Sequence, residues 1–409
     1  MRDVARITVT LLEPAAAGKR LRTDFVQDTY DHLPGTVVRG ALAARCLNES
    51  EQDPDVVSKS AEFLETFEGA GSFGPLHNEN SLPLPLSVKQ HKYAPGEKCD
   101  VVCRDQKFKP VEDESCPTCK QELEFSKGEA TGSVPQHRRT RTELDEEGVA
   151  RAGQLFTQNS LDRETRFSGW LHGPALSALR IGNQPIDTLY FGGRTKHQGA
   201  AMVHVDTEVE PEPVEQDGNV LVLRLLGPGV FVDEYGLPSL KPDLQELSDQ
   251  LSVEALEVQK CWTRWCEVEG WHAASGLPKP TERAVQPGST YLIRCDGPAE
   301  PQARKRLMAR GIGLRRREGF GALYSGQRSL DPREIANSAA HMRTAEEHAT
   351  YGPLLRERAK RMLTEPVDDA PYRDRIAVND EYAQGLSKLL DIVDPTLFDE
   401  VLSSLERSS

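Results

Sequence analysis

Residues 304–322 read RKRLMARGIGLRRREGFGA, and we start from this stretch because it bears most directly on the fold. Its four glycines and three consecutive arginines are Gly311, Gly313, Gly319, Gly321, Arg315, Arg316 and Arg317. Glycine adopts backbone conformations that are closed to other residues, and successive exposed N–H groups in such a loop form a concavity that binds anions. Arginine forks bind phosphate in bidentate fashion. We therefore predict a polyanion-binding loop between a basic helix over 299–310 and a strand that begins at Ala322.

The basic loop is an island on an acidic protein. The 409 residues carry 64 acidic and 50 basic side chains, with a formal net charge of −14. A charge of this sign favours solubility and weakens non-specific binding to other polyanions. The composition therefore indicates one specific polyanion site and argues against a general DNA-coating role.

The chain has no features of a membrane protein. Its mean hydropathy is −0.54, and no apolar run approaches the length of about 20 residues that a membrane span needs. The first residues, MRDVARITVTLLEPAAAGKR, lack the apolar core of a signal peptide. We expect a cytoplasmic protein.

The first half of the chain mixes strands and helices. An alternating run over Val4–Leu12 predicts a strand. Pro34 and Gly35 set a turn before a helical pattern over Val38–Leu47, and residues 55–68 are a second helical candidate. Later strand candidates are QHRRTRTEL, GQLFTQNSL and TRFSGWLHG, and a short helical pattern covers Pro174–Arg180.

The second half repeats the first in outline. Residues 206–219 are acidic and rich in proline and valine, so they read as a linker, after which LVLRLLGPGVFV opens a new strand. Each half closes with a helix, a glycine loop and a strand, and the first of these loops is Gly192–Gly199. Repetition at this spacing indicates a duplicated domain. We predict an α+β protein with domains at 1–205 and 220–330, followed by a helical tail over 331–409.

A cysteine cluster lies in residues 96–135, which read as an insertion. Cys99, Cys103, Cys116 and Cys119 follow the spacing C-x3-C-x12-C-x2-C. In a reducing compartment clustered cysteines favour metal binding, and four thiolates close a tetrahedral structural zinc site. We expect Zn to staple this insertion, the alternative being four free thiols.

At this point the chain resembles the RAMP superfamily of CRISPR-associated proteins. The similarity is greatest to the Cas-five group of type III effector complexes, and in particular to its type III-D member, the Csx-ten family. Four stretches carry the resemblance: Leu33–Leu42, Arg139–Phe156, Pro278–Tyr291 and Gly311–Gly321. The Gly192–Gly199 loop is a reduced version of the last, which argues against an RNA role there.

The resemblance implies two ferredoxin-like (RRM-like) domains and a non-catalytic subunit that binds crRNA. The subunit would hold the 5′ repeat-derived handle of the guide and would contact the large type III subunit and the adjacent backbone RAMP subunit. It would meet target RNA only indirectly and would serve antiviral defence. The zinc-ribbon-like insertion and the tail lie outside the shared pattern.

The residue types within these stretches indicate which residues would contact RNA. The expected RNA-binding residues are Thr36, Arg39, Arg139, Arg141, Arg310, Gly311, Gly313, Arg315, Arg316, Arg317, Gly319, Phe320 and Gly321. Thr36 and Arg39 stand at a helix start, where backbone N–H groups favour phosphate, and a structural salt bridge is the alternative for Arg39. Arg139 and Arg141 share one face of a strand. Phe320 either stacks on a base or packs beneath the loop.

Two rival functions stay open. His32 is a candidate for the general base of a RAMP endonuclease that matures the guide, but the sequence has no second histidine at a recognisable spacing. The other rival is a purely structural, zinc-stapled subunit without RNA contacts. The core is expected to include Trp262, Trp265 and Trp271. The tail has helical candidates with an apolar stripe at Leu354, Leu355, Ala359 and Met362. These helices dock either on the protein's own second domain or on a partner.

Overall fold

The computed structural model divides the chain into two compact units, Met1–Gly326 and Gln327–Ser409. Each unit is described by itself. The structure describes residues 3–19, 26–93, 102–105, 115, 120–130, 132–181, 184–192, 198–254, 256–272, 277–325, 355–362, 398 and 402.

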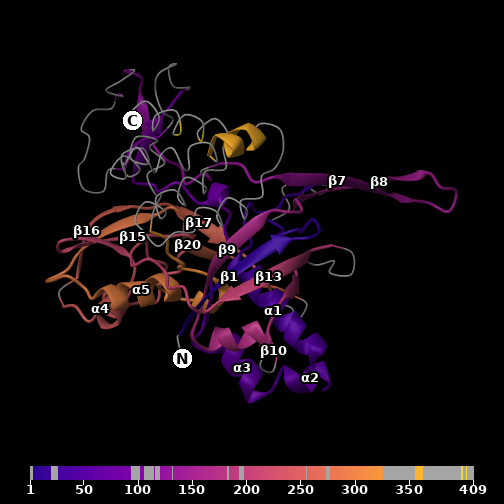
Figure 1. The fold of residues 1–409 in the computed structure, drawn as a ribbon, viewed down its shortest axis with the longest axis horizontal. Coiled ribbons are helices and arrows are strands. Elements are labelled where there is room, and N and C mark those ends of the chain that lie inside the picture. Colours follow the sequence, from indigo (N-terminus) through magenta and orange to yellow (C-terminus); the bar gives the residue numbers. More distant parts are fainter. Residues whose placement is uncertain are drawn as a thin grey trace. The chain divides into compact units, whose positions relative to one another are not determined.

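The first unit contains a five-stranded antiparallel sheet in its N-terminal half (Figure 1). Its strands, in spatial order, are β12 (Thr188–Tyr190), β13 (Ala200–Asp206), β1 (Val4–Leu11), β9 (Arg166–His172) and β3 (Ser72–Phe73). Helix α1 (Gly35–Glu49) connects β1 to β3, and β9 lies between these two strands. This is the split βαβ arrangement of ferredoxin-like folds. The predicted strand at the N-terminus is confirmed, one residue shorter than expected.

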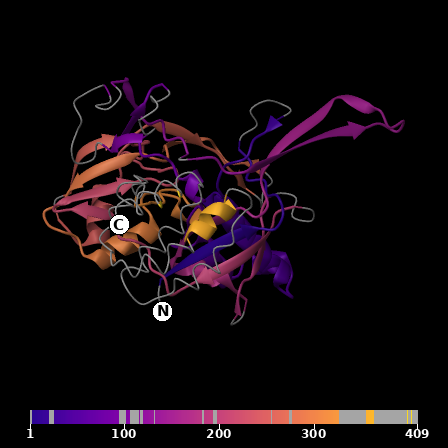
Figure 2. The same ribbon diagram turned by 45° about the horizontal axis from the view of Figure 1, so that its top comes forward.

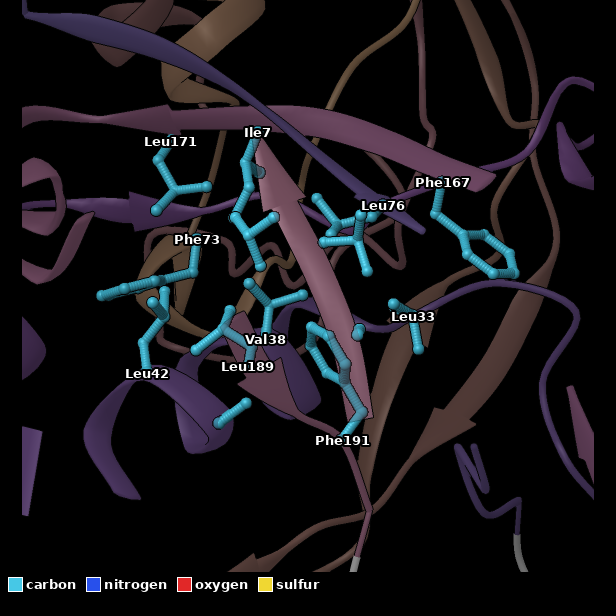
Figure 3. Packing of buried hydrophobic residues seen from close by; sticks show 14 of the residues in the cluster. Ile7, Leu33, Val38, Leu42, Phe73, Leu76, Phe167, Leu171, Leu189 and Phe191 are labelled. Carbon is cyan, nitrogen blue, oxygen red and sulfur yellow. The ribbon is translucent and has the colours of Figure 1, made fainter. Parts of the chain in front are cut away.

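Alternation along β1 builds the core of this sheet. Ala5, Ile7, Val9 and Leu11 are fully buried, because successive side chains of a strand point to opposite faces. They pack with Val38 and Leu42 of α1 in one hydrophobic cluster (Figure 3). Phe73 of β3 stacks on Phe67, with ring centroids 5.7 Å apart.

The other predicted helices of this half differ from the expectation in detail. Residues 55–68 form two helices, α2 (Pro54–Val57) and α3 (Ala61–Glu68), because Ser60 caps the second one by accepting a hydrogen bond from the Phe63 N–H at 3.2 Å. The short pattern at 174–180 is the 3₁₀ helix η2 (Gly173–Leu179). The predicted α1 helix is confirmed and is longer than its apolar pattern.

The C-terminal half of the first unit repeats the element order. Its sheet has the order β14 (Glu215–Asp217), β15 (Val220–Arg224), β21 (Thr290–Arg294) and β16 (Glu257–Trp262). Helix α4 (Leu244–Leu251) lies between β15 and β16 in sequence, and α5 (Pro301–Arg310) follows β21. After the glycine loop, Leu323 bridges antiparallel to Leu225, directly beyond β15. Both halves thus contain, in this order, a strand, a helix, two strands, a helix and a final segment that pairs beside the first strand. In the first half these are β1, α1, β3, β9, η2 and β13, and in the second half β15, α4, β16, β21, α5 and the segment at Leu323.

Each sheet has its own hydrophobic cluster. The second cluster runs from Val214 to Leu323 and includes Leu221, Leu223 and Leu307. Val214 and strand β14 belong to the segment predicted as a linker, so this segment contributes to the second core. The halves also bond to each other, since Ser72 Oγ of β3 donates to the Ala309 carbonyl of α5 at 3.2 Å.

A long hairpin extends from the first half as an arm (Figures 1 and 2). It consists of β7 (Gln136–Leu144) and β8 (Ala150–Leu161), and β2 (Val26–Gln27) pairs in parallel with the base of β8. Asp145 stabilises the tip by accepting from the Val149 N–H at 2.8 Å. The strands predicted around QHRRTRTEL and GQLFTQNSL are confirmed as the two strands of this arm.

Smaller elements complete the first unit. A three-stranded sheet joins β5 (Val102–Asp105), β4 (Val88–His91) and β6 (Leu123–Phe125). The remaining strands pair as β10 (Arg180–Ile181) with β11 (Gln184–Pro185), β17 (Trp265–Val268) with β20 (Glu282–Val285), and β18 (Trp271–His272) with β19 (Leu277–Pro278). Two further 3₁₀ helices are η1 (Glu79–Ser81) and η3 (Arg316–Glu318). The insertion is therefore tied to the body, because two of its strands pair with β4.

The second unit contains a helix over residues 355–362. Leu355 and Ala359 of the predicted apolar stripe are buried there, while Leu354 lies outside the described residues. Arg358 covers the ring of Phe398 at 4.5 Å. Among the helices of both units that the structure describes, none is long and apolar enough to cross a membrane.

Candidate functional site

The glycine loop closes the second half with a chain of left-handed backbone positions. Gly311, Gly313, Gly319 and Gly321 all have positive φ angles, between 67° and 84°. A Cβ on Gly321 would lie 1.7 Å from the Ile312 carbonyl oxygen, so only glycine fits this position. The special conformations expected from the sequence are therefore present.

This loop meets the proline-glycine turn at the start of α1. A Cβ built on Gly35 would lie 2.5 Å from the Gly319 Cα and 2.2 Å from the Phe73 carbonyl oxygen. The two backbones touch because neither residue has a side chain in the way. Two stretches that the sequence singled out separately, 284 residues apart, thus form one junction.

Glu68 links the arginines of the junction. Arg39 Nε donates to the Phe67 carbonyl at 3.0 Å, and its Nη2 pairs with the Glu68 carboxylate. Arg317 Nη1 donates to the Glu68 carbonyl at 2.8 Å, and its Nε lies 3.4 Å from the carboxylate. The salt bridge that the sequence left as an alternative for Arg39 is therefore present. Arg317 remains 44% exposed, and it presents the more open guanidinium of the two.

Arg315 is held beneath the loop. It donates two hydrogen bonds to Glu318, at 3.1 and 2.8 Å, and lies 3.1 Å from Glu282. Lys279 Nζ also donates to Glu318, at 2.7 Å. Burial alone would raise the pKa of the Glu318 carboxyl, but the hydrogen bonds from Arg315 and Lys279 outweigh it and lower the pKa to about 2. This carboxylate is a fixed, ionised part of the loop.

Arg316 and Arg310 form a second basic pair. Arg316 bonds to the Glu246 carboxylate of α4, which also accepts from the Gly313 N–H at 3.3 Å. Burial and the nearby positive charge of Arg316 lower the pKa of Arg310. The loop thus concentrates positive charge and offsets part of it with carboxylates from α3 and α4.

Phe320 packs beneath the loop rather than standing free. Its side chain is buried in a cluster with Val230, Val268 and Ala284, and the guanidinium of Arg315 lies 4.5 Å from its ring centroid. Of the two alternatives for Phe320, packing beneath the loop is the one present in this structure.

The start of α1 offers backbone donors near the same junction. Its N-cap residue is Pro34, and no side chain caps the helix. The first turn contains no acidic residue, and Thr36 is half-buried there. Uncapped N–H groups at a helix N-terminus favour anions. Together with Arg39 and Arg317, the turn can bind a phosphate.

The remaining predicted arginines lie on the arm. Arg139 and Arg141 are exposed and share a face of β7, opposite Gln158 and Phe156 of β8. Phe156 is itself 49% exposed. Basic side chains with an exposed aromatic ring on the neighbouring strand are suited to single-stranded nucleic acid.

A pair of histidines was missed by the sequence reasoning. His32 stacks on His77 with ring centroids 4.2 Å apart, and its Nδ1 lies 2.8 Å from Asp31. His77 Nδ1 faces the Ser81 carbonyl at 2.9 Å, while its Nε2 is buried without a partner. Burial and the charge of His32 lower the pKa of His77 well below its ordinary value, so His77 is neutral near pH 7. The pair could have been found only from the fold, because 45 residues separate the two histidines.

The zinc prediction falls outside the described residues. Cys99, Cys116 and Cys119 belong to segments that the structure does not describe, and Cys103 is placed only as backbone in β5. Within the described part of the chain there is no cluster of three or more metal-binding side chains. The cysteines whose side chains the structure describes are Cys46, Cys261, Cys266 and Cys295, all free thiols.

Comparison with known proteins gives one family match. The model of CRISPR-associated proteins of the Cas_Cmr3 family matches residues 125–328, just under half of the chain. This range contains the arm, the second sheet and the glycine loop. The match supports a CRISPR-associated protein of the RAMP type. No curated protein sequence matches the chain.

Several solved structures are similar at low identity. A chain of the type III-B Cmr-beta complex bound to cognate target RNA and AMPPnP is 15% identical, with a TM-score of 0.39 over 70% of this chain and 86% of that chain. The product of a Cas6-related gene from Pyrococcus furiosus is 10% identical, with a TM-score of 0.32 over 78% and 98%. Oligomeric Cmr4 from Pyrococcus furiosus is 11% identical, with a TM-score of 0.23 over 50% and 98%. At TM-scores below 0.5, none of these likenesses bears on the function of this chain.

Proposed function

We propose that the chain is a non-catalytic crRNA-binding subunit of a type III CRISPR effector complex, of the III-D kind. It holds the 5′ repeat-derived handle of the guide and contacts the large subunit and the adjacent backbone subunit. Its two halves are ferredoxin-like domains, and a zinc staple orders the cysteine-containing insertion.

The observation that carries this proposal is the junction between the Pro34–Gly35 turn and the glycine loop. Backbone contact between Gly35 and Gly319 brings together a helix N-terminus and two arginines, Arg39 and Arg317, which share Glu68. The family match covers the loop and the arm. A helix start, a glycine loop and guanidinium groups are each suited to phosphate.

The carboxylates at the junction are compatible with RNA binding. A guanidinium has five N–H donors. Arg317 directs its Nη1 and Nε groups to Glu68, and its side chain stays 44% exposed. Glu68 thus fixes the plane of Arg317 and leaves donors that face solvent. A phosphate gains a guanidinium that is already oriented, so less side-chain entropy is lost on binding.

The test is the affinity for an RNA that carries the handle of the chain's own CRISPR repeat. Arg317→Ala is expected to weaken binding roughly fivefold and to reduce the salt slope by about 0.7, which is the share of one phosphate contact on a single strand. Arg317→Lys should retain the slope. Arg163→Ala, at a 70% exposed arginine between β8 and β9, is the matched control and should bind as the parent does. Equal affinity and equal slope for Arg317→Ala and the control would refute the assignment of the loop.

The stacked histidines favour one alternative, an RNA endonuclease that matures the guide. His32, whose Nδ1 lies 2.8 Å from Asp31, could accept a proton as the general base, and buried His77 stacks on its ring. Incubation of the purified chain with repeat RNA decides between the two functions. We expect no cleavage; specific cleavage that is lost in both His32→Ala and His77→Ala would establish the alternative.

A further inference from the structure

A cavity of about 490 Å³ lies in the first half, and its described lining residues include no arginine of the junction. Its walls come from α1, from the paired strands β2 and β8, and from the end of β12. The lining residues are Ala16, Gly18, Gln27, Val37, Gly40, Ala41, Ala44, Gln158, Tyr190, Phe191, Gly192 and Gln198. The volume lies within the range of small-ligand pockets.

One wall is a smooth face of α1. Val37, Gly40, Ala41 and Ala44 follow the spacing i, i+3, i+4, i+7, so they share one side of the helix. A Cβ on Gly40 would meet nothing within 4 Å. The wall is therefore flat and open, and a planar ligand can lie against it.

The opposite wall contains paired amides. Gln27 of β2 and Gln158 of β8 are direct neighbours in the parallel ladder. Gln158 Nε2 donates to Gln27 Oε1 at 3.5 Å, which is a long and therefore weak bond. Each amide has two donors and an acceptor, so most of this capacity is left for a ligand.

The chemistry of the lining side chains indicates which chemical group of a ligand the cavity can bind. The twelve lining residues that the structure describes include no acid, lysine, arginine or histidine. Three glutamines supply donors and acceptors together, and Tyr190, which is 50% exposed, supplies an aromatic face at the rim. A neutral, planar group with a hydrogen-bonding edge has this chemistry, and in RNA that group is the base.

The position on α1 relates the cavity to the phosphate site. Helix α1 begins at Gly35 in the junction, and Gly40 lies about 7.5 Å further along the axis. Arg39, which pairs with Glu68, directly precedes Gly40. A strand whose phosphates are held at the start of α1 can therefore turn a neighbouring base into the cavity.

We propose that this cavity receives one unstacked base of the bound RNA, which Gln27 and Gln158 read by hydrogen bonds while Tyr190 covers it. The inference rests on the proposed function, since it assumes that RNA is bound. The sequence argued against an RNA role for the Gly192–Gly199 loop, but Gly192 and Gln198 line this cavity, so the inference reverses that expectation.

The test uses handle RNAs in which 2-aminopurine replaces each base in turn. With the parent chain, one position is expected to show a fluorescence change on binding that differs from its neighbours. Gly40→Leu adds a bulky side chain to the wall of the cavity, at a position where a Cβ meets nothing within 4 Å. It should abolish that change and weaken RNA binding roughly tenfold, the effect of losing one stacked base. Asn48→Leu, on an exposed part of the same helix, is the control and should leave both unchanged.

A second pair of variants separates recognition of the base by hydrogen bonds from its fit to the shape of the cavity. Gln158→Ala and Gln27→Ala should reduce the preference among the four bases at that one position while the affinity for the least favoured base stays within about threefold. If the parent binds RNA but no position responds, or if Gly40→Leu leaves the response intact, the inference is overturned and the proposed function stands. If the parent binds no handle RNA at all, both are overturned.

Discussion

Replacing Glu318 with glutamine tests whether the glycine loop is held together by charge. Glu318 is buried and accepts hydrogen bonds from Arg315 and Lys279. Glutamine keeps the size of the side chain and removes its charge, which leaves two cations facing a neutral amide. We expect Glu318→Gln to lower the free energy of unfolding of the first unit by about 3 kcal/mol at pH 7.

The magnitude follows from the pKa of this carboxyl. It falls from 4.5 to about 2 in the folded protein, and each tenfold change in proton affinity corresponds to about 1.4 kcal/mol. Because the folded pKa is depressed, the stabilisation is fully present above pH 4.5 and is lost as the pH falls towards 2. At pH 3 the difference between the two proteins should shrink to about 1.4 kcal/mol.

The assay is urea denaturation of both proteins at pH 7 and pH 3, followed by tryptophan fluorescence. Glu282→Gln is the control, because Glu282 also faces Arg315 but is 42% exposed, and exposed ion pairs contribute about 1 kcal/mol or less. A loss below about 1 kcal/mol at pH 7 for Glu318→Gln, or a loss that is equal at both pH values, would refute the charge-based account of the loop.

Two further predictions concern the backbone junction and the insertion. Gly319→Ala should destabilise the protein by roughly 2 kcal/mol or more in thermal unfolding. The reason is that φ at Gly319 is +84° and the new Cβ would lie 2.7 Å from the Gly35 Cα. The control is Gly40→Ala, in an open helical position, which should instead stabilise the protein by up to about 1 kcal/mol. Elemental analysis after purification without chelator should find about one zinc per chain, and a fourfold serine variant of the cysteines should lose it; less than half an equivalent in the parent would contradict the zinc staple. The four cysteines are Cys99, Cys103, Cys116 and Cys119.

Local patterns in the sequence predicted the elements that depend on local physics. The alternation of Val4–Leu12 gave the central strand, and the glycines of the loop adopt the positive φ angles for which glycine is suited. The helix after Pro34 was also predictable, because a turn residue precedes an apolar pattern. These features need no knowledge of distant residues.

The partners of the arginines could not be predicted in this way. Arg317 bonds to Glu68 across 249 residues, and Arg316 to Glu246 across 70. In an acidic chain many carboxylates are candidates, and the fold alone selects these two. Of the described ion pairs of the three consecutive loop arginines, Arg315–Glu318 has a local signal, since the two residues are three apart.

Aromatic residues show the same limit. The tryptophans were expected in the core, but Trp265 is 41% exposed on β17, and Trp262 is half-buried beneath Lys260. The core prediction is wrong for Trp265, because among the described strands β17 pairs with β20 in a two-stranded sheet, and Trp265 and Glu267 of β17 are exposed. Burial of a residue in a short strand depends on what the sheet packs against, which the sequence pattern does not contain.

The central claim is that the first unit recognises the 5′ handle of a guide RNA. Its most direct test is the equilibrium affinity of the purified chain for two RNAs of equal length at about 150 mM salt, one with the native repeat-derived handle and one with the handle bases shuffled. The account predicts tighter binding of the native handle, by at least about tenfold. Equal affinity for both RNAs would contradict it.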